Sequence, residues 1–131
     1  METRDAFIVS LRGETEGAID HSSPEEKFQN QTIRPILKLQ NDLLLNVFRN
    51  YVAKYKNDFY AYPVEKKLQY IENAIHKDIK FRNSLKGIVI GLFTVSEYAD
   101  YIKNSSGLNK RMMNMLIDRL KSQVQLFELQ S

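Results

Sequence analysis

PILKLQNDLLLNVFRNYVAKYK, residues 35 to 56, is the stretch that decides the fold class. At ~100° per residue, its large apolar side chains fall on one wide face of an α-helix. A face this wide predicts a helix that contacts two or three neighbours instead of lying on a surface. The apolar residues on this face are Ile36, Leu37, Leu43, Leu44, Val47, Phe48, Tyr51, Val52 and Tyr55.

A helix start precedes this stretch at residues 23 to 26, SPEE. The Ser23 hydroxyl can accept from a first-turn amide, Pro24 suits the first helical position, and Glu26 completes a capping box. Pro35 then falls inside the helical pattern. Because proline lacks the N–H and its ring crowds the preceding turn, we expect a kink or break near residues 33–34.

The chain after residue 56 predicts further helices. Residues 57–62 form a turn, and Pro63 opens a helix whose apolar stripe is Leu68, Ile71, Ile75 and Ile79. The following apolar set, Leu85, Ile88, Val89 and Leu92, centres on a different face. This change of face predicts a break near Asp78, whose carboxylate can cap a new helix.

A second capping box, TVSE at residues 94–97, predicts a short helix over 95–103. Residues 104–107, NSSG, are expected to form a loop. The last helix is predicted over 108–127, and its inward residues are Met112, Met113, Leu116, Ile117, Leu120, Val124 and Phe127.

No segment alternates with period two, and the one strand-like stretch, 87–93, is short and flanked by helical pattern. Connections are short, so neighbouring helices should be antiparallel. The sequence therefore predicts an all-α fold, an antiparallel helical bundle of four to six helices, some of them kinked or broken near Pro35 and Asp78.

Composition limits the classes of protein that remain. The chain has 131 residues and no cysteine, which excludes thiol catalysis and cysteine-based zinc sites and fits a reducing compartment. We find no apolar segment long enough for a signal peptide or a membrane span. We therefore expect a cytoplasmic protein that does not bind a membrane.

Charge is distributed unevenly along the chain. Residues 1–26 hold seven acidic and two basic side chains, whereas the remaining residues hold 17 basic and nine acidic ones. We expect residues 1–22 to be an acidic, mobile or loosely docked arm, and residues 23–131 to be the helical bundle domain. A basic body of this kind attracts acidic partners, so nucleic acid or another polyanion is a possible ligand, with the arm as an internal competitor.

The most informative polar residues are Arg82 and Lys86, which lie one helical turn apart. Gly87 and Gly91 follow at a spacing that permits close approach of another helix. One interpretation is close helix packing through these glycines, and the other is an anion pocket that also includes Gln40, an amide at the centre of an apolar stripe. Alternatively, the two cations pair with carboxylates such as Glu97 or Asp42, or simply face water.

Two sets of large side chains are candidates for a partner surface. They either fill the core or, if exposed, bind a homo-oligomeric or other protein partner, because aromatic residues and methionine are enriched at such interfaces. The set in the turn is Phe59, Tyr60 and Tyr62, and the set in the last helix is Met112, Met113 and Met115.

Chemistry of other kinds has little support in the sequence. The two histidines are His21 and His76, and His76 follows Glu72 at a spacing that matches neither a di-iron nor a zinc-protease motif. A phosphotransfer histidine is a weak alternative to an ordinary solvated one. We therefore assign no catalytic residue, no metal and no cofactor.

Three stretches carry a family resemblance: residues 28–51 (FQNQTIRPILKLQNDLLLNVFRNY), 70–98 (YIENAIHKDIKFRNSLKGIVIGLFTVSEY) and 108–120 (LNKRMMNMLIDRL). Together they resemble a family of short bacterial all-helical proteins, some of which bear the name glyoxalase. The resemblance spans about residues 24–127 and implies no particular catalytic residue. Glyoxalase I is built from βαβββ modules with His, Gln and Glu metal ligands on strands, and the residues here do not support that activity.

From the sequence we expect a non-enzymatic helical module that self-associates and binds a protein partner. Binding of nucleic acid or another polyanion is the main alternative, and a small-molecule enzyme is a third.

Overall fold

The computed structural model describes residues 3–13, 23–55 and 58–128, and every regular element in these ranges is helical. Residues 24–54 form one almost continuous, bent helical stretch, so the described chain contains six helical segments, as the sequence predicted. The α-helices are α1 (Arg4–Arg12), α2 (Pro24–Phe28), α3 (Arg34–Leu39), α4 (Asn41–Lys54), α5 (Val64–Lys77), α6 (Ile79–Ile90), α7 (Val95–Tyr101) and α8 (Ser105–Ser122).

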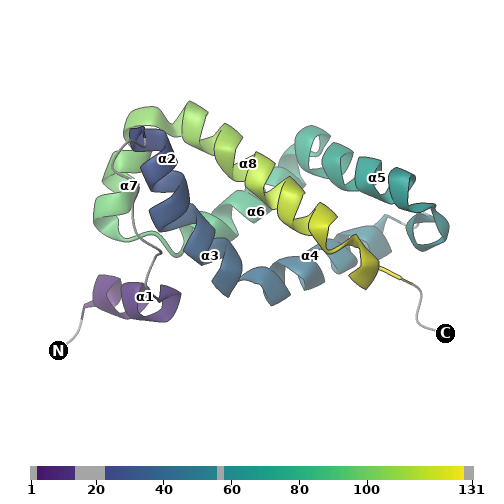
Figure 1. Ribbon diagram of the computed structural model, residues 1–131, viewed down its shortest axis with the longest axis horizontal. Coiled ribbons are helices and arrows are strands. Elements are labelled where there is room, and N and C mark those ends of the chain that lie inside the picture. Colours follow the sequence, from purple (N-terminus) through teal and green to yellow (C-terminus); the bar gives the residue numbers. More distant parts are fainter. Residues whose placement is uncertain (1–2, 14–22, 56–57, 129–131) are drawn as a thin grey trace.

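The helices form a bundle in which α8 crosses the middle of the molecule and packs against α5 and α6 (Figure 1). α5 and α8 run in opposite directions, which confirms the antiparallel arrangement. α1 lies at one end of the bundle, near α3 and α7, and the start of α5 lies at the other. None of the described helices is long and apolar enough to cross a lipid bilayer.

The expected kink before Pro35 is a π-helical turn over Gln29–Ile33, in which the Arg34 amide donates to the Gln29 carbonyl. Pro35 has no N–H to offer the Gln31 carbonyl one turn earlier. The Arg12 Nη2 group donates to that carbonyl at 3.2 Å instead. The proline therefore both bends the helix and leaves an acceptor that α1 uses.

The predicted apolar face of residues 35–56 is wrong in part. Gln40 forms a turn between α3 and α4, and the buried residues of α4 are Leu44, Leu45, Phe48 and Val52. The face of α4 that meets the core is thus rotated toward Leu45, and Leu43 is exposed.

The predicted break at Asp78 is confirmed. Its Oδ1 accepts from the Phe81 amide at 3.1 Å and caps α6, while its Oδ2 accepts from the Tyr51 hydroxyl at 3.0 Å. The predicted stripe of α5 is wrong at its ends, since Ile79 is exposed and Lys67 is buried. The Lys67 ammonium donates to the Phe127 carbonyl at 2.9 Å, so a cation here attaches the end of the chain to α5.

The second capping box is confirmed, because the Thr94 side chain and the Glu97 side chain each accept from the other's backbone amide. The expected loop at 104–107 is wrong. α8 already begins at Ser105, and Glu25 of α2 and Arg111 of α8 form a salt bridge of 3.1 Å beside this turn.

Aromatic side chains fill the core. Phe48 lies with its ring centroid 5.5 Å from Phe59 and 4.9 Å from Phe127, and all three are fully buried. A second group centres on Phe93, whose ring contacts Phe28 and Tyr101. The contacts link α4, the turn before α5 and the segment after α8 in one group, and α2, α7 and the residues after α6 in the other.

Candidate anion-binding pocket

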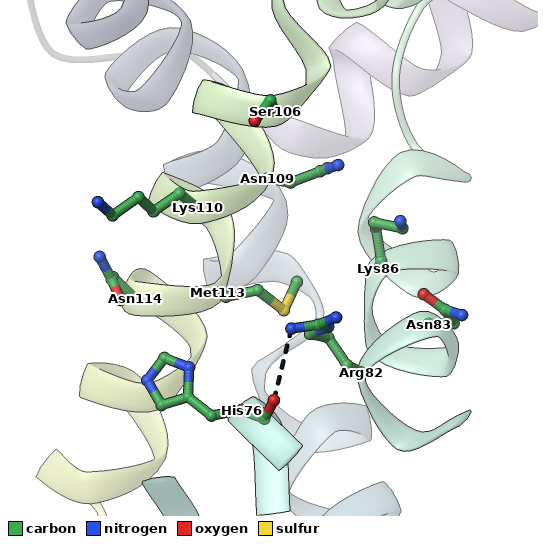
Figure 2. Close-up of a pocket in the computed structure, with 9 residues that line it drawn as sticks. All are labelled: His76, Arg82, Asn83, Lys86, Ser106, Asn109, Lys110, Met113 and Asn114. Carbon is green, nitrogen blue, oxygen red and sulfur yellow. Dashed lines mark hydrogen bonds between the residues drawn. The ribbon is translucent and has the colours of Figure 1, made fainter. Parts of the chain in front are cut away.

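A cavity of about 390 Å³ lies beside α6 and α8, close to the end of α5 (Figure 2). Its floor includes the buried Met113. Arg82, Lys86 and Asn109 are half-buried at its sides, and the other five lining residues are exposed. The residues that line the cavity are His76, Arg82, Asn83, Lys86, Ser106, Asn109, Lys110, Met113 and Asn114.

The local sequence of α6 explains why two cations face this cavity. Phe81, Leu85 and Val89 recur at every fourth position and are buried in the core. Arg82 and Lys86 each come one residue after a member of this set, which places them ~100° further around the helix. They therefore lie on the flank of the buried stripe and are half-buried. The change of face at Asp78, seen in the sequence, is what sets this orientation.

Arg82 is only partly satisfied within the protein. Its Nη1 group donates to the His76 carbonyl at 3.4 Å, near the end of α5, where a cation also complements the helix dipole. Figure 2 shows the guanidinium extending from α6 toward α8, beside Met113. The other guanidinium N–H groups have no acceptor in the described part of the chain, so they remain available to a ligand.

α8 supplies the opposite side. Lys110 and Asn114 are exposed at the rim, and Asn109 points from α8 toward α6 (Figure 2). The Asn109 Oδ1 atom accepts from the Tyr101 hydroxyl. That contact fixes the amide so that its NH₂ group can donate elsewhere.

The charges of the cavity are not balanced. No aspartate or glutamate lines it, and neither Lys86 nor Lys110 makes an ion pair within residues 3–13, 23–55 and 58–128. Other basic residues of the bundle do have carboxylate partners: Arg111 pairs with Glu25, and Lys121 pairs with Glu72 at 2.9 Å. Three cations without a carboxylate partner in the described chain, Arg82, Lys86 and Lys110, thus lie around this one cavity.

Glu72 is the acidic side chain nearest to the rim histidine, with its Oε1 4.0 Å from the His76 Nε2 atom. A hydrogen bond from Lys121 lowers the pKa of Glu72 below its ordinary value. The carboxylate thus has its own cationic partner on α8, outside the cavity.

The structure brings only part of the predicted pocket together. Arg82 and Lys86 line the cavity, as the anion-pocket interpretation required. Gln40 lies at the turn between α3 and α4, and neither it nor the two glycines, Gly87 and Gly91, is among the lining residues.

The predicted close packing through the glycines is wrong. A side chain at Gly87 would meet no atom within 4 Å, and one at Gly91 would approach only the carbonyls of its own segment. Both glycines are exposed, because the buried stripe of α6 runs through positions 81, 85 and 89 instead.

The predicted partner-surface residues are divided between the core and its edge. Phe59 and Met112 are fully buried, Met113 forms the cavity floor, and Tyr60, Tyr62 and Met115 are partly buried against the core. The Lys66 ammonium lies 4.0 Å from the centroid of the Tyr62 ring, an attractive cation–π contact.

A second cluster of charges lies at the other end of α6, and the sequence analysis did not foresee it. The Arg12 guanidinium donates to both carboxylate oxygens of Glu97, at 2.6 and 2.8 Å, and to the Gln31 and Leu92 carbonyls. Arg4 donates to the carbonyls of Gly91 and Phe93. α1 is thereby attached to carbonyls that follow the last turn of α6.

The Arg12–Glu97 pair is largely buried, with 7% and 20% of the two side chains exposed. Burial raises the pKa of Glu97, but hydrogen bonds from Arg12, Thr94 and Thr32 more than offset this, so the pKa lies below its ordinary value of 4.5. The Glu97 carboxyl group therefore stays ionised at neutral pH. This cluster holds the fold together and has no free cation to offer a ligand.

The residues that the sequence analysis did not assign to the pocket come mainly from α8. Ser106 belonged to the expected loop at 104–107, and Lys110 and Asn114 carried no signal except exposure on a basic helix. Within the described ranges, no three His, Cys, Asp or Glu side chains lie close enough to hold a metal ion.

Comparisons with models of known protein families, with curated proteins and with solved structures give no match. The resemblance to glyoxalase-named bacterial proteins therefore stays a prediction, and function is argued from the geometry alone.

Proposed function

We propose that this protein binds an anionic, phosphate-bearing ligand in the cavity beside α6 and α8, and that it acts as a binding module and not as an enzyme. The observation that carries this proposal is the set of three cations, Arg82, Lys86 and Lys110, around one cavity without a lining carboxylate.

The electrostatics of the cavity favour an anion. Arg82 and Lys86 are like charges one turn apart, and such a pair destabilises a helix by about 0.2–0.5 kcal/mol. An anion placed between them removes this repulsion and accepts charge-assisted hydrogen bonds, each roughly twice as strong as a neutral one. A guanidinium is also the side chain best matched to the oxygens of a phosphate group.

The test is a titration of the full chain with inorganic phosphate and with pyrophosphate at low ionic strength, followed by amide NMR shifts and calorimetry. Saturable binding should move the amides of α6 and α8 near residues 82–86 and 106–114. Loss of one charged hydrogen bond costs about 1.5–3 kcal/mol, so Lys86→Met should weaken binding about 10- to 100-fold.

The matched control is Lys103→Met, which removes the same charge from an exposed residue outside the cavity. The Nζ atom of Lys103 lies 3.8 Å from the Oδ1 atom of Asp100. It should change the affinity less than about twofold, as expected for a surface charge outside the site. Equal weakening by the two variants, or no saturable binding at all, would contradict the proposal.

Nucleic acid stays a wider alternative that the basic body supports. Deleting residues 1–22 is a poor test of it, because Arg12 contacts both α7 and the bent segment before Pro35. A cleaner test measures binding of the full chain to single-stranded RNA against salt concentration. A steep loss of affinity with salt supports this alternative, and Lys86→Met should then reduce the slope by about one charge.

Self-association or binding of a protein partner also stays a proposal. It is favoured by α1, which leaves the apolar side chains of Phe7, Val9 and Leu11 more than half exposed. Size-exclusion chromatography with light scattering tests it, and a strict monomer at every concentration would count against self-association.

A further inference from the structure

The cavity contains a second set of groups that the three cations do not explain. Asn83, Asn109, Asn114 and Ser106 are neutral polar residues, and they make up almost half of its lining. An inorganic anion would need only the cations, so these side chains indicate what else the ligand carries.

Amides and hydroxyls differ from ammonium groups because they both donate and accept hydrogen bonds. A sugar or polyol hydroxyl also both donates and accepts hydrogen bonds. A side-chain amide can therefore accept from the proton of such a hydroxyl and donate to its oxygen lone pairs. Asn109 is the best-placed member, because the Tyr101 hydroxyl holds its Oδ1 atom and the side chain points from α8 toward α6 (Figure 2).

The lining also argues against other ligand classes. No Phe, Tyr or Trp lines this cavity of the described chain, so the exposed imidazole of His76 is the single lining ring on which a nucleobase could stack. Met113 is the single apolar residue, which disfavours a lipid or another hydrophobic molecule. The volume of about 390 Å³ lies near the lower end of ligand-binding pockets, which run from roughly 300 to 1,000 Å³.

We infer that the cavity binds the phosphate monoester of a small polyhydroxylated molecule, a sugar phosphate, with the phosphate at Arg82 and Lys86 and the hydroxyls at Asn109 and Asn114. This inference rests on the proposed function and names the class of ligand for the same site. Lys110, at the rim on α8, adds attraction for the phosphate without fixing its position.

The experiment compares three probes on the full chain by calorimetry: ribose 5-phosphate, ribose and inorganic phosphate. Two or more hydroxyl contacts at about 0.5–1.5 kcal/mol each should make ribose 5-phosphate bind at least about fivefold more tightly than inorganic phosphate. Ribose alone should show no saturable binding, because it lacks the charged group.

Two asparagine variants separate the two halves of the site. Asn109→Ala and Asn114→Ala should each weaken ribose 5-phosphate by about 2- to 10-fold and change inorganic phosphate by less than twofold. Asn114 is exposed and makes no hydrogen bond among the described residues, so its variant tests recognition even if Asn109→Ala alters the contact with Tyr101. The matched control is Asn73→Ala, an exposed asparagine of α5 outside the cavity.

The outcomes distinguish the sugar phosphate inference from the proposal that the cavity binds an anion. If inorganic phosphate binds in a Lys86-dependent way but ribose 5-phosphate binds no more tightly, the inference is overturned and the proposed function stands. If neither binds, both are overturned. If adenosine monophosphate binds more than tenfold more tightly than ribose 5-phosphate, the base is recognised and the sugar phosphate assignment is wrong.

Discussion

The two ends of α6 present arginine side chains in contrasting environments. Beyond its last turn, the guanidinium of Arg12 makes two hydrogen bonds to Glu97 and further ones to the carbonyls of Gln31 and Leu92. In its first two turns, Arg82 has a single 3.4 Å contact with a carbonyl, and Lys86 has no partner within the described chain.

The difference separates a structural role from a binding role. A buried pair with two hydrogen bonds between its charged groups is costly to break, because removing one partner leaves the other charge buried alone. Half-buried cations without a carboxylate contribute nothing comparable to stability, and they even repel one another. The two ends should therefore respond to substitution with effects of opposite sign.

The largest expected effect is at the structural end. Arg12→Ala should lower the free energy of unfolding by about 3 kcal/mol, since it leaves Glu97 buried without its cation. Urea denaturation measures this change. Arg4→Ala is the matched control, because 54% of its side chain is exposed and its loss should cost under about 1 kcal/mol. Similar losses for the two variants would show that the buried pair is not the main contact of α1.

The next effect concerns pH. The pKa of Glu97 is lower in the folded protein than its ordinary value of 4.5, so its contribution to stability is present above that value and is lost as pH falls through the folded pKa. Glu97→Gln should lower stability by about 2 kcal/mol at pH 7 through the lost charged hydrogen bonds.

The same variant should also flatten the dependence of the urea midpoint on pH below about 4.5. Glu25, Glu72 and Asp78 also have lowered pKa values, so part of the acid dependence should persist. An unchanged pH profile in the variant would contradict the role given to Glu97.

A smaller effect on stability, with the opposite sign, is expected at Gly87, which lies between the two ends of α6. Gly87→Ala should raise the free energy of unfolding by about 0.5–1 kcal/mol, because alanine is the better helix former and its methyl group would meet no atom within 4 Å. A loss of stability would instead support close packing at this glycine, the interpretation that the structure contradicts.

The smallest effect is expected at the pocket. Lys86→Met should raise the free energy of unfolding by about 0.3 kcal/mol at low salt, by removing the repulsion with Arg82. Added salt should reduce the gain, since it screens exposed charges. A clear loss of stability would mean that Lys86 has a structural partner, and would weaken the case that it is kept for a ligand.

Much of the helical pattern could be predicted because it depends on near neighbours. Pro35, Asp78 and Thr94 act on backbone groups three to five positions away, and the structure confirms the bend, the cap and the capping box. Which face of each helix is buried was harder to predict. The turn at Gln40 and the burial of Lys67 depend on the side chains and carbonyls that other segments place against them.

Only part of the candidate site could be predicted from the sequence. Arg82 and Lys86 could be paired because they lie one turn apart on α6, but Asn109 and Lys110 belong to another helix. Gln40, Gly87 and Gly91 were grouped with the cations by pattern alone, and the packing of α6 through positions 81, 85 and 89 leaves them out.

The amino-acid sequence by itself determined that this chain forms helices, where most of them begin, and that two cations lie beside a buried stripe. Spacing and end-capping fix these features, since they involve groups within about one turn. Only the tertiary structure decided which cations are neutralised. Arg12 meets Glu97 across 85 positions of sequence, while Arg82 and Lys86 line a cavity together with amide side chains and another lysine. Such pairings depend on how the helices pack, and no local pattern encodes them.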